Sequence, residues 1–431
     1  MISRTGRALV ACGSCLNDAL RAQAQWELDV SRTLLRRRKV LLLLALVPIL
    51  LVMGIEFAEA ALPETLGGRK AYLPTFVTPV VFWGSVFTGL LAGLITGVIG
   101  AGGGYILTPA LMSFGVKGIL AVGTDQFHLF AKAIMGTAVH RKLGNVNVWL
   151  AVWFVAGSAL GVTLGGYINR HIYHANPSLS DSFISLLYVL FLGFLGIYAL
   201  ADWYRRRGSG KGGEAAQAET TALAQRLQAL PWRPRVKFDQ DLAHGGRSIS
   251  VHPVMVCGFV VGLVAAVIGV GGGFLTFPMF VYGLGVSTFT TVGTDIFQII
   301  FTTSYSSITQ YAIYGYIFYT VALGMLLGSL IGVQIGALVT TQVRGSVIRG
   351  FYAITILAGF VNRLTALPRR LADAGFLSLD ARVGQIIETV GVVLFFALVS
   401  IFALWVLVCF VRNLSALRGS QARAQKENGQ P

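Results

Sequence analysis

GLITGVIGAGGG, at residues 93–104, returns further along the chain as GLVAAVIGVGGG, at residues 262–273. The two stretches are identical at eight of twelve positions. Each is followed by the sequence Val-Gly-Thr-Asp, at 122–125 and again at 292–295, and matching residues lie 169 to 171 positions apart. A match held over this distance predicts two copies of one structural repeat.

Composition places this repeat in a membrane. Of the 431 residues, 55% are hydrophobic and 12% are charged, whereas soluble domains carry about 25% charged residues. Apolar runs alternate with short polar stretches, and a run of roughly 20 residues spans a bilayer. The formal net charge is +16, but the basic residues cluster beside apolar runs, which favours membrane lipid over nucleic acid as a partner. The sequence therefore predicts an all-α polytopic membrane protein.

Each copy is predicted to contain five helical segments, of which the second is too short to cross a bilayer. These short segments, at 104–115 and 273–285, follow the glycine-rich runs. Because a spanning helix needs roughly 20 residues, we expect the break to lie within the membrane, as a discontinuous helix or a re-entrant hairpin. Since five is an odd number, the two broken-helix repeats are predicted to be inverted, as in many secondary transporters.

Polar and basic stretches divide the rest of the chain. The predicted order is a basic cytoplasmic segment (1–39), an extra first span (40–58), the first copy (78–202), a basic cytoplasmic linker (203–250), the second copy (252–365), an extra last span (385–411) and a cytoplasmic tail (412–431). Loops rich in Lys and Arg stay inside, which predicts a multi-pass protein of the cell (inner) membrane with both termini in the cytoplasm. A loop expected at 363–384 carries four arginines and would lie outside, against that rule.

The glycine runs are the first candidate site. Clustered glycines weaken a helix and let a ligand approach the backbone. A helix that begins after the run presents unpaired N–H groups and the positive end of its dipole, which together bind anions. Close packing between helices is the alternative interpretation. The predicted substrate-binding glycines are Gly100, Gly102, Gly103, Gly104, Gly269, Gly271, Gly272 and Gly273.

The two Val-Gly-Thr-Asp sequences open polar helix faces, which form the second candidate site. Asp125, His128 and Lys132 are spaced i, i+3 and i+7 and so share a face. The matching residues of the second copy are Asp295, Gln298 and Thr302. Ionisable groups inside a span are costly and by default indicate function. The predicted coupling residues are Asp125, Asp295 and His128, and the predicted substrate-binding residues are Thr124, Thr294, Lys132 and Gln298.

Other interpretations of these faces stay open. An aspartate stabilises the start of a helix, so both aspartates fit a capping role as well as they fit proton coupling. Lys132 is placed either to pair with Asp125 or to attract the anion. Both faces and both glycine runs are expected around one shared site near the middle of the bilayer.

Glycines also recur at every fourth position later in each copy. They are Gly157, Gly161 and Gly165, matched by Gly328, Gly332 and Gly336. Ridges of small residues at helical spacing let two helices approach closely. We therefore predict that these six glycines pack against neighbouring helices.

Taken together, these motifs resemble the sulfite exporter TauE/SafE family, also called the toluene-sulfonate uptake permease superfamily. The resemblance rests on the glycine runs, the Val-Gly-Thr sequences, Gly144-Asn145-Val146 and the glycine ridges, and it covers roughly 78–202 and 252–365. It implies an all-helical inner-membrane carrier for sulfite, sulfoacetate, other organosulfonates or related sulfur anions. Many family members have Ser after Val-Gly-Thr, whereas both copies here have Asp.

The predicted function is secondary transport of a small sulfur-containing anion, coupled to protons. A passive anion channel, or transport of a different small anion, is the alternative. The sequence contains no hydrolase motif and no cluster with metal-ligand spacing, so it predicts no enzymatic activity, no metal and no cofactor. The expected partners are the small anion and membrane lipid, with self-association into a homo-oligomer left open.

Overall fold

The structure is a computed structural model that describes residues 78–99, 103–142, 146–207, 222–239, 246–271, 275–276, 279–340 and 345–427. Helices dominate these residues, and the strands among them form one two-stranded sheet. Several predictions fall outside the described residues: the basic segment (1–39), the first span (40–58), Gly100, Gly102, Gly272 and Gly273.

Each copy of the repeat supplies five consecutive elements. The first copy contains α3 (Pro79–Ile99), α4 (Gly104–Ser113), α5 (Gly118–Lys142), α6 (Val148–Ala175) and α7 (Pro177–Arg207). The second contains α9 (Val251–Ile268), the π-helix η2 (Met279–Leu284), α11 (Thr288–Tyr305), α12 (Tyr319–Thr340) and α13 (Gly345–Asp373). Two short turns, η3 (Ser306–Tyr311) and η4 (Ala312–Tyr314), continue from α11, and α14 (Ala381–Glu427) follows the second copy.

Local side chains set the limits of several helices. The Asn147 side chain accepts the N–H of Leu150 (3.0 Å) at the start of α6. Ser250 caps α9, and Gly269 ends that helix with a φ of 81°. Glycine adopts this left-handed conformation without a steric cost, so α9 stops where the predicted break begins.

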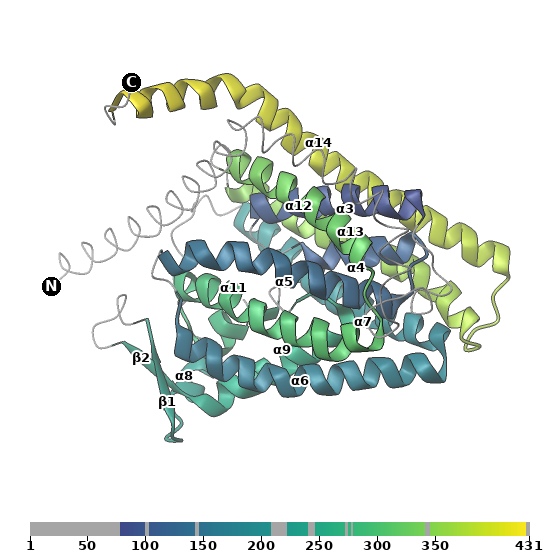
Figure 1. Cartoon of the computed structure of the whole chain (residues 1–431), viewed down its shortest axis with the longest axis horizontal. Helices are drawn as coiled ribbons and strands as arrows, with labels where there is room; N and C mark the ends of the chain where they lie inside the picture. The colour runs from purple at the N-terminus through teal and green to yellow at the C-terminus, as the bar shows by residue number, and fades with distance from the viewer. Residues whose placement is uncertain are drawn as a thin grey trace.

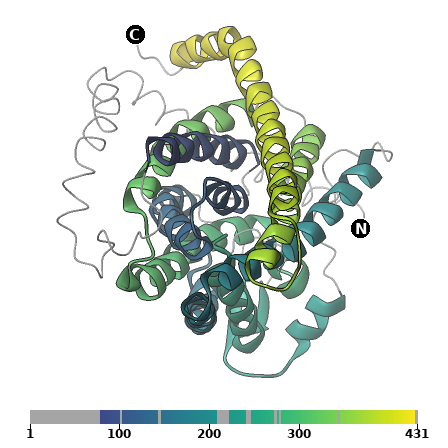
Figure 2. The ribbon, with the colours of Figure 1, turned by 90° about the vertical axis from the view of Figure 1, so that its right-hand side faces the viewer.

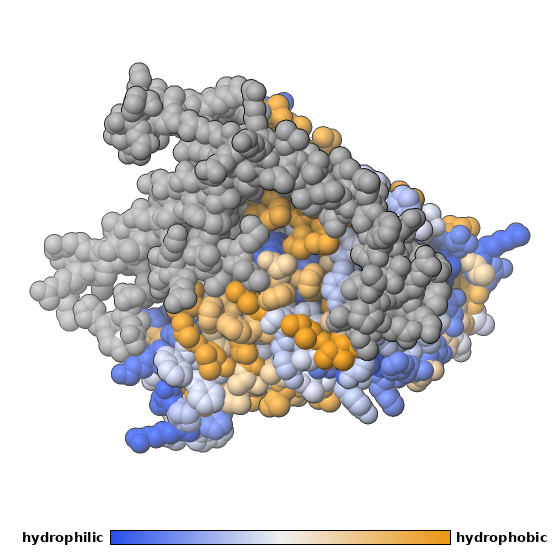
Figure 3. Space-filling view, in the orientation of Figure 1, coloured by the Kyte–Doolittle hydropathy of each residue, from blue (hydrophilic) through white to orange (hydrophobic). Residues whose placement is uncertain are grey.

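Within the described residues, six helices are long and apolar enough to cross a membrane: α3, α6, α7, α9, α13 and α14. Figure 3 shows apolar side chains over the middle of the visible face, between hydrophilic groups at its two ends. α5 and α11 are not among the six, because buried polar and ionisable side chains interrupt their apolar sequence. The prediction of an all-α polytopic membrane protein is confirmed.

The most extensive helix contacts join the two copies to each other. α3 packs on α12 and α6 packs on α9, so the first segment of each copy lies against the fourth segment of the other (Figures 1 and 2). The third segments, α5 and α11, pack together, and so do the fifth segments, α7 and α13. Each contact thus has a counterpart when the copies are exchanged, which is what a two-fold axis between them would produce.

Glycine contacts show the direction of the fifth segments. Gly193 of α7 lies against Phe360 of α13, and Gly196 lies against Leu357. Residue numbers therefore rise along α7 as they fall along α13. The fifth segments of the two copies are antiparallel.

The glycine ridges lie between helices of different copies. A Cβ on Gly157 would overlap the carbonyl oxygen of Met255, and one on Gly161 would overlap that of Phe259. Gly328 meets the backbone of α3 in the same way. A larger residue does not fit unless the helices move apart, so the predicted packing role is confirmed at these positions.

The segment between the copies, predicted only as a polar linker, contains regular structure. Helix α8 (Ala222–Ala229) precedes an antiparallel hairpin of β1 (Arg235–Phe238) and β2 (Arg247–Ser250). Apolar side chains of the hairpin pack with Phe280 and Leu284 of η2. We call α8, β1 and β2 the hairpin unit; its strands lie at the left edge of the molecule in Figure 1.

The loop predicted at 363–384 is mostly helical, which corrects that boundary, because α13 runs on to Asp373 and α14 begins at Ala381. Arg363 is buried and donates a hydrogen bond to the carbonyl oxygen of Pro109 (3.1 Å). Arg370 lies 3.6 Å from Asp181. Because these two arginines have partners inside the protein, they are not free loop charges of the kind that determine orientation.

Candidate functional site

The broken segments of the two copies meet beside α5. Gly103, with a φ of 62°, precedes α4, and Gly269 ends α9. A Cβ on Gly269 would come within 2.9 Å of both Thr108 Oγ1 and Val122 Cα, which belong to the first copy. Gly104 lies against Val270 in the same region. The glycines therefore bring the two breaks into contact, and they leave room for backbone rather than side chains there.

A buried polar chain runs through the first copy and ends on the second. Thr108 Oγ1 donates a hydrogen bond to Asp125 Oδ2 (3.0 Å). Asp125 Oδ1 is 3.7 Å from His128 Nδ1, and His128 Nε2 is 3.0 Å from Ser329 Oγ on α12. Asp125 Oδ1 and His128 Nδ1 have no hydrogen-bond partner in the part of the chain that the structure describes. A distance of 3.7 Å is too long for a hydrogen bond between them.

The second copy carries a corresponding chain that ends on the first. Gln298 Nε2 donates to Asp295 Oδ1 (2.8 Å). Thr302 Oγ1 donates to Gln298 Oε1 (2.7 Å) and lies 2.9 Å from Ser158 Oγ on α6. In the second copy, residues one turn apart are hydrogen-bonded to each other, so its predicted polar face is a connected set of side chains. In the first copy, Asp125 and His128 face each other across 3.7 Å without a hydrogen bond.

Ser158 and Ser329 are functional candidates that the motif analysis did not single out. Each follows the first glycine of a ridge, and the two residues occupy matching positions of the repeat. Each hydroxyl contacts the polar face of the other copy. Their shared repeat position was the available signal, although it does not reveal which side chain they contact.

Lys132 brings a positive charge to the break in the first copy. Its Nζ donates a hydrogen bond to Thr96 Oγ1 on α3 (2.8 Å). Thr96 in turn lies against Gly103, where a Cβ would come within 2.9 Å of the threonine hydroxyl. No side chain caps the N-terminus of α4 that follows. An ammonium group and the positive end of a helix dipole thus converge at one place, a combination that attracts anions.

Thr124 and Thr294 hold the two copies together. Thr124 Oγ1 accepts the N–H of Phe318, just before α12 (3.0 Å). Thr294 Oγ1 accepts the N–H of Asn147, just before α6 (3.0 Å). Both threonine side chains are buried and satisfied by backbone, which gives them a structural role here; their contact with substrate stays a prediction.

The register between α5 and α11 follows from their contacts. Gly123, near the start of α5, lies against Tyr311, at the end of η3. Leu129 and Thr303 both lie against Gly271. Numbers therefore rise along α5 as they fall along α11, and the third segments of the two copies are antiparallel.

This register separates the two aspartates along the helix axes. Lys132 and Thr302, at matching positions of the repeat, lie near the same level. Asp125 and Asp295 lie on opposite sides of that level, roughly 20 Å apart at a rise of about 1.5 Å per residue. The two polar chains are thus arranged in sequence along the bundle rather than around one point.

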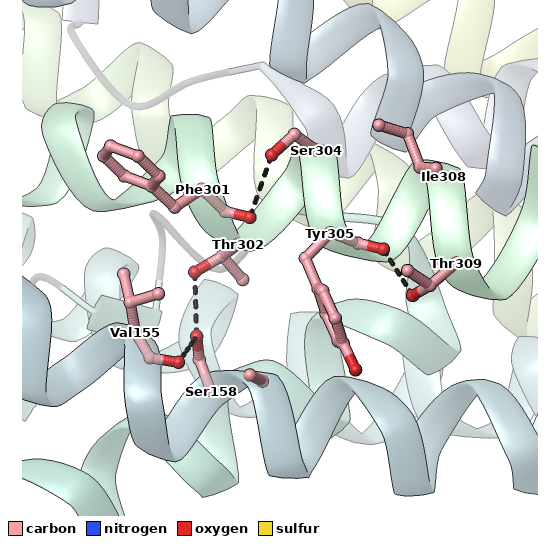
Figure 4. Close-up of a pocket in the computed structure, with 9 residues that line it drawn as sticks. Val155, Ser158, Phe301, Thr302, Ser304, Tyr305, Ile308 and Thr309 are labelled. Carbon is pink, nitrogen blue, oxygen red and sulfur yellow. Dashed lines mark hydrogen bonds between the residues drawn. The ribbon is translucent and has the colours of Figure 1, made fainter.

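A pocket of about 340 Å³ opens between α6 and α11. Figure 4 shows Ser158 and Thr302 hydrogen-bonded at one side of it, with Tyr305 pointing across from α11 towards α6. Three of its lining side chains are exposed, namely Phe301, Tyr305 and Ile308. The pocket has the volume of a small-molecule site, and through Thr302 it connects with the chain that ends at Asp295.

A multi-pass helical bundle with buried polar and ionisable side chains where its halves meet is typical of membrane transporters. The chain belongs to the sulfite exporter TauE/SafE family, whose sequence profile matches residues 85–363. In the described ranges, no group of three or more His, Cys, Asp or Glu side chains is placed to hold a metal ion.

Curated relatives agree with this class. The probable membrane transporter protein YjnA of Bacillus subtilis is 27% identical over 254 residues, which are 58% of this chain and 87% of that protein. A probable membrane transporter protein of Xylella fastidiosa is 23% identical over 268 residues, covering 61% and 86% of the two chains. YunE of Bacillus subtilis, also a probable membrane transporter protein, is 23% identical over 269 residues, 60% of this chain and 88% of its own. No solved structure matches the chain.

Proposed function

We propose that this protein is a proton-coupled secondary carrier of a small sulfur oxyanion, such as sulfite or a small organosulfonate. The observation that carries the proposal is the position of Lys132, whose ammonium group lies beside Thr96 and the uncapped N-terminus of α4. The family description, sulfite exporter TauE/SafE, supports sulfur oxyanions as the substrate class.

The anion would bind next to the break in the first copy. Its oxygens would accept hydrogen bonds from Lys132 Nζ and from the first N–H groups of α4. Charge-assisted hydrogen bonds of this kind are about twice as strong as neutral ones. A site made of one lysine and backbone dipoles binds a small anion without requiring a large cavity.

Asp125 and His128 would carry the coupling proton. Their facing atoms, Oδ1 and Nδ1, are buried, 3.7 Å apart and without another hydrogen-bond partner among the described residues. One proton placed between them would draw the two groups into hydrogen-bonding distance. The pair lies on the same helix as Lys132, so its protonation changes the charge that the anion meets.

Antiparallel pairing of α5 with α11 and of α7 with α13 supports inverted copies. If these helices cross the membrane, a two-fold axis between the copies lies in the membrane plane. The Asp125 chain and the Asp295 chain would then face opposite sides of the membrane. In place of the one shared site expected from the sequence, we propose a transport path with Asp125 towards one side of the membrane, Asp295 towards the other side and Lys132 between them.

The hairpin unit would face the cytoplasm of a cell whose inner membrane holds the protein. Arg226, Arg233, Arg235 and Lys237 are exposed on it, and basic residues next to spans stay inside. This orientation places the end of α13 outside and the C-terminal end of α14 inside. If a membrane-impermeant thiol reagent labelled Lys237→Cys in intact cells, the hairpin unit would lie outside and the proposed orientation would be reversed.

Flux through proteoliposomes tests the proposed function. We expect saturable transport of sulfite, thiosulfate or a small sulfonate that accelerates under an imposed proton gradient. Fast flux with no response to the gradient would favour the passive channel instead. Correctly folded protein that moves none of these anions would contradict the sulfur-anion assignment and leave the membrane fold untouched.

Lys132→Gln should weaken anion binding without blocking transport. Glutamine can still donate to Thr96, but it removes the charge, and a hydrogen bond to a charged group contributes about 1.5–3 kcal/mol. The half-saturating anion concentration should therefore rise by about tenfold or more. Lys237→Gln, on the exposed face of β1, is the matched control and should change nothing. An unchanged half-saturating concentration in Lys132→Gln would exclude the lysine from the binding site.

A further inference from the structure

Asp239, the residue directly after β1 of the hairpin unit, holds the first turn of α11. Its Oδ2 accepts the N–H of Ser287 (2.9 Å), and its Oδ1 accepts the hydroxyls of Ser287 (2.5 Å) and Thr290 (2.6 Å). The Asp239 side chain is buried, and its backbone has a φ of 53°, which is uncommon outside glycine. Three hydrogen bonds to one carboxylate fix the start of the helix that carries Asp295.

The hairpin unit is itself attached to the elements next to α11. Arg247 donates to the carbonyl oxygen of Gly285 (3.0 Å), and Gln228 donates to that of Leu284 (2.7 Å). Asn147, before α6, donates through its side chain to the carbonyl oxygen of Lys237 (2.9 Å). Movement of α11 at this end therefore requires the Asp239 contacts to break or the whole unit to move.

Asp181 of α7 holds the start of α5 in the same way, at the opposite end of the helix bundle. Its Oδ1 accepts the N–H of Gly118, the first residue of α5 (2.7 Å). Its Oδ2 lies 3.9 Å from Lys117 and 3.6 Å from Arg370. Arg370 also contacts Glu388 of α14 (3.1 Å). A buried carboxylate thus holds the N-terminus of each helix that carries a polar face, although the two acids come from unrelated parts of the chain.

We propose that Asp239 and Asp181 are positioning residues for transport, and that each closes one end of the path by holding the start of α11 or α5. The inference rests on the proposed carrier function. Both contacts are made in this structure, and both Asp125 and Asp295 are buried. Access from either side then requires the acid at that end to release its helix, while the other acid keeps the far end closed.

Hydrogen–deuterium exchange of the purified full chain in nanodiscs tests this inference without any substrate. Asp239→Asn leaves one accepting oxygen where the carboxylate has two. We expect exchange in the first turn of α11 to accelerate about fivefold, the effect of losing a typical N-terminal cap, and exchange at the start of α5 to slow. Asp181→Asn should produce the opposite pattern. The exposed Asp373→Asn is the matched control and should alter neither end.

The reciprocal change is the decisive readout. Faster exchange only at the altered end, with the other end unchanged, would reduce both acids to ordinary helix caps and overturn the proposal. If Asp239→Asn does not fold, Thr290→Val removes one of the two donated hydroxyls, keeps both the carboxylate and the Ser287 cap of α11, and should give the same pattern. The exchange measurement needs no anion, so it tests this inference separately from the proposed function. A reciprocal change in exchange without sulfur-anion flux would contradict only the proposed substrate. Normal flux without a reciprocal change would contradict only the roles of Asp239 and Asp181.

Discussion

Asp125→Asn should strongly slow gradient-driven accumulation of the anion while leaving the protein folded. The amide has the volume of the carboxylate, and its oxygen can still accept the hydrogen bond of Thr108. It carries no charge opposite His128 and cannot take up a proton between them. Hydrogen bonds to charged groups contribute about 1.5–3 kcal/mol. At about 1.4 kcal/mol for each factor of ten, the expected loss in the rate of gradient-driven uptake is roughly ten- to a hundredfold.

The comparison needs a control that removes an acid elsewhere. Asp373→Asn, at the exposed end of α13, changes the net charge by the same amount and should transport normally. Exchange of anion between equal concentrations should persist in Asp125→Asn if only coupling is lost. Full accumulation by this variant would remove Asp125 from the coupling step and return it to the capping role that the sequence left open.

The repeat could be predicted from the sequence because it consists of short motifs and of residues at helical spacing. Gly157 and Gly161 recur at helical spacing, and the structure places them against the backbone of α9 as predicted. Asp125 and His128 were predicted to share a face, and they lie one turn apart on α5. Spacing of three or four residues along one helix is sufficient to derive such neighbours.

Contacts between the copies could not be predicted in the same way. Thr96 meets Lys132, and Ser329 meets His128, only because α12 packs against both α3 and α5 and so brings these helices together. No periodicity within one helix encodes which helix lies next to it. The separation of Asp125 from Asp295 has the same origin, because it depends on the antiparallel register of α5 and α11.

The hairpin unit shows a second limit. Its strands are four residues long, and their apolar side chains, Val236, Phe238 and Ile249, are buried in a cluster with residues of α6, α9 and η2. Short strands of this kind depend on tertiary contact more than on intrinsic preference. A basic, polar stretch of sequence therefore predicts a linker, and the structure adds the element that holds α11.

Gly161→Ala should strongly destabilise the protein, because it adds a methyl group where α6 and α9 are in backbone contact. The new Cβ would overlap the carbonyl oxygen of Phe259 and lie 2.8 Å from the amide nitrogen of Leu263. Both are backbone atoms, so no side chain can rotate away. α6 and α9 must separate along their length, and overpacking of this kind costs about 1–3 kcal/mol. Since the obstruction is backbone, we expect about 3 kcal/mol and a thermal midpoint lower by about 5 °C.

Gly283→Ala is the matched control, because nothing lies within 4 Å of the Cβ that it would add. Its midpoint in detergent should equal that of the unaltered protein. Gly328 occupies in the α3–α12 contact the position that Gly157 occupies in the α6–α9 contact. Gly328→Ala should therefore also lower the thermal midpoint. Because the two contacts share no residues, the effects of Gly161→Ala and Gly328→Ala should add in the double variant. If Gly161→Ala unfolds at the same temperature as Gly283→Ala, the close approach of α6 and α9 is not what holds the two copies together.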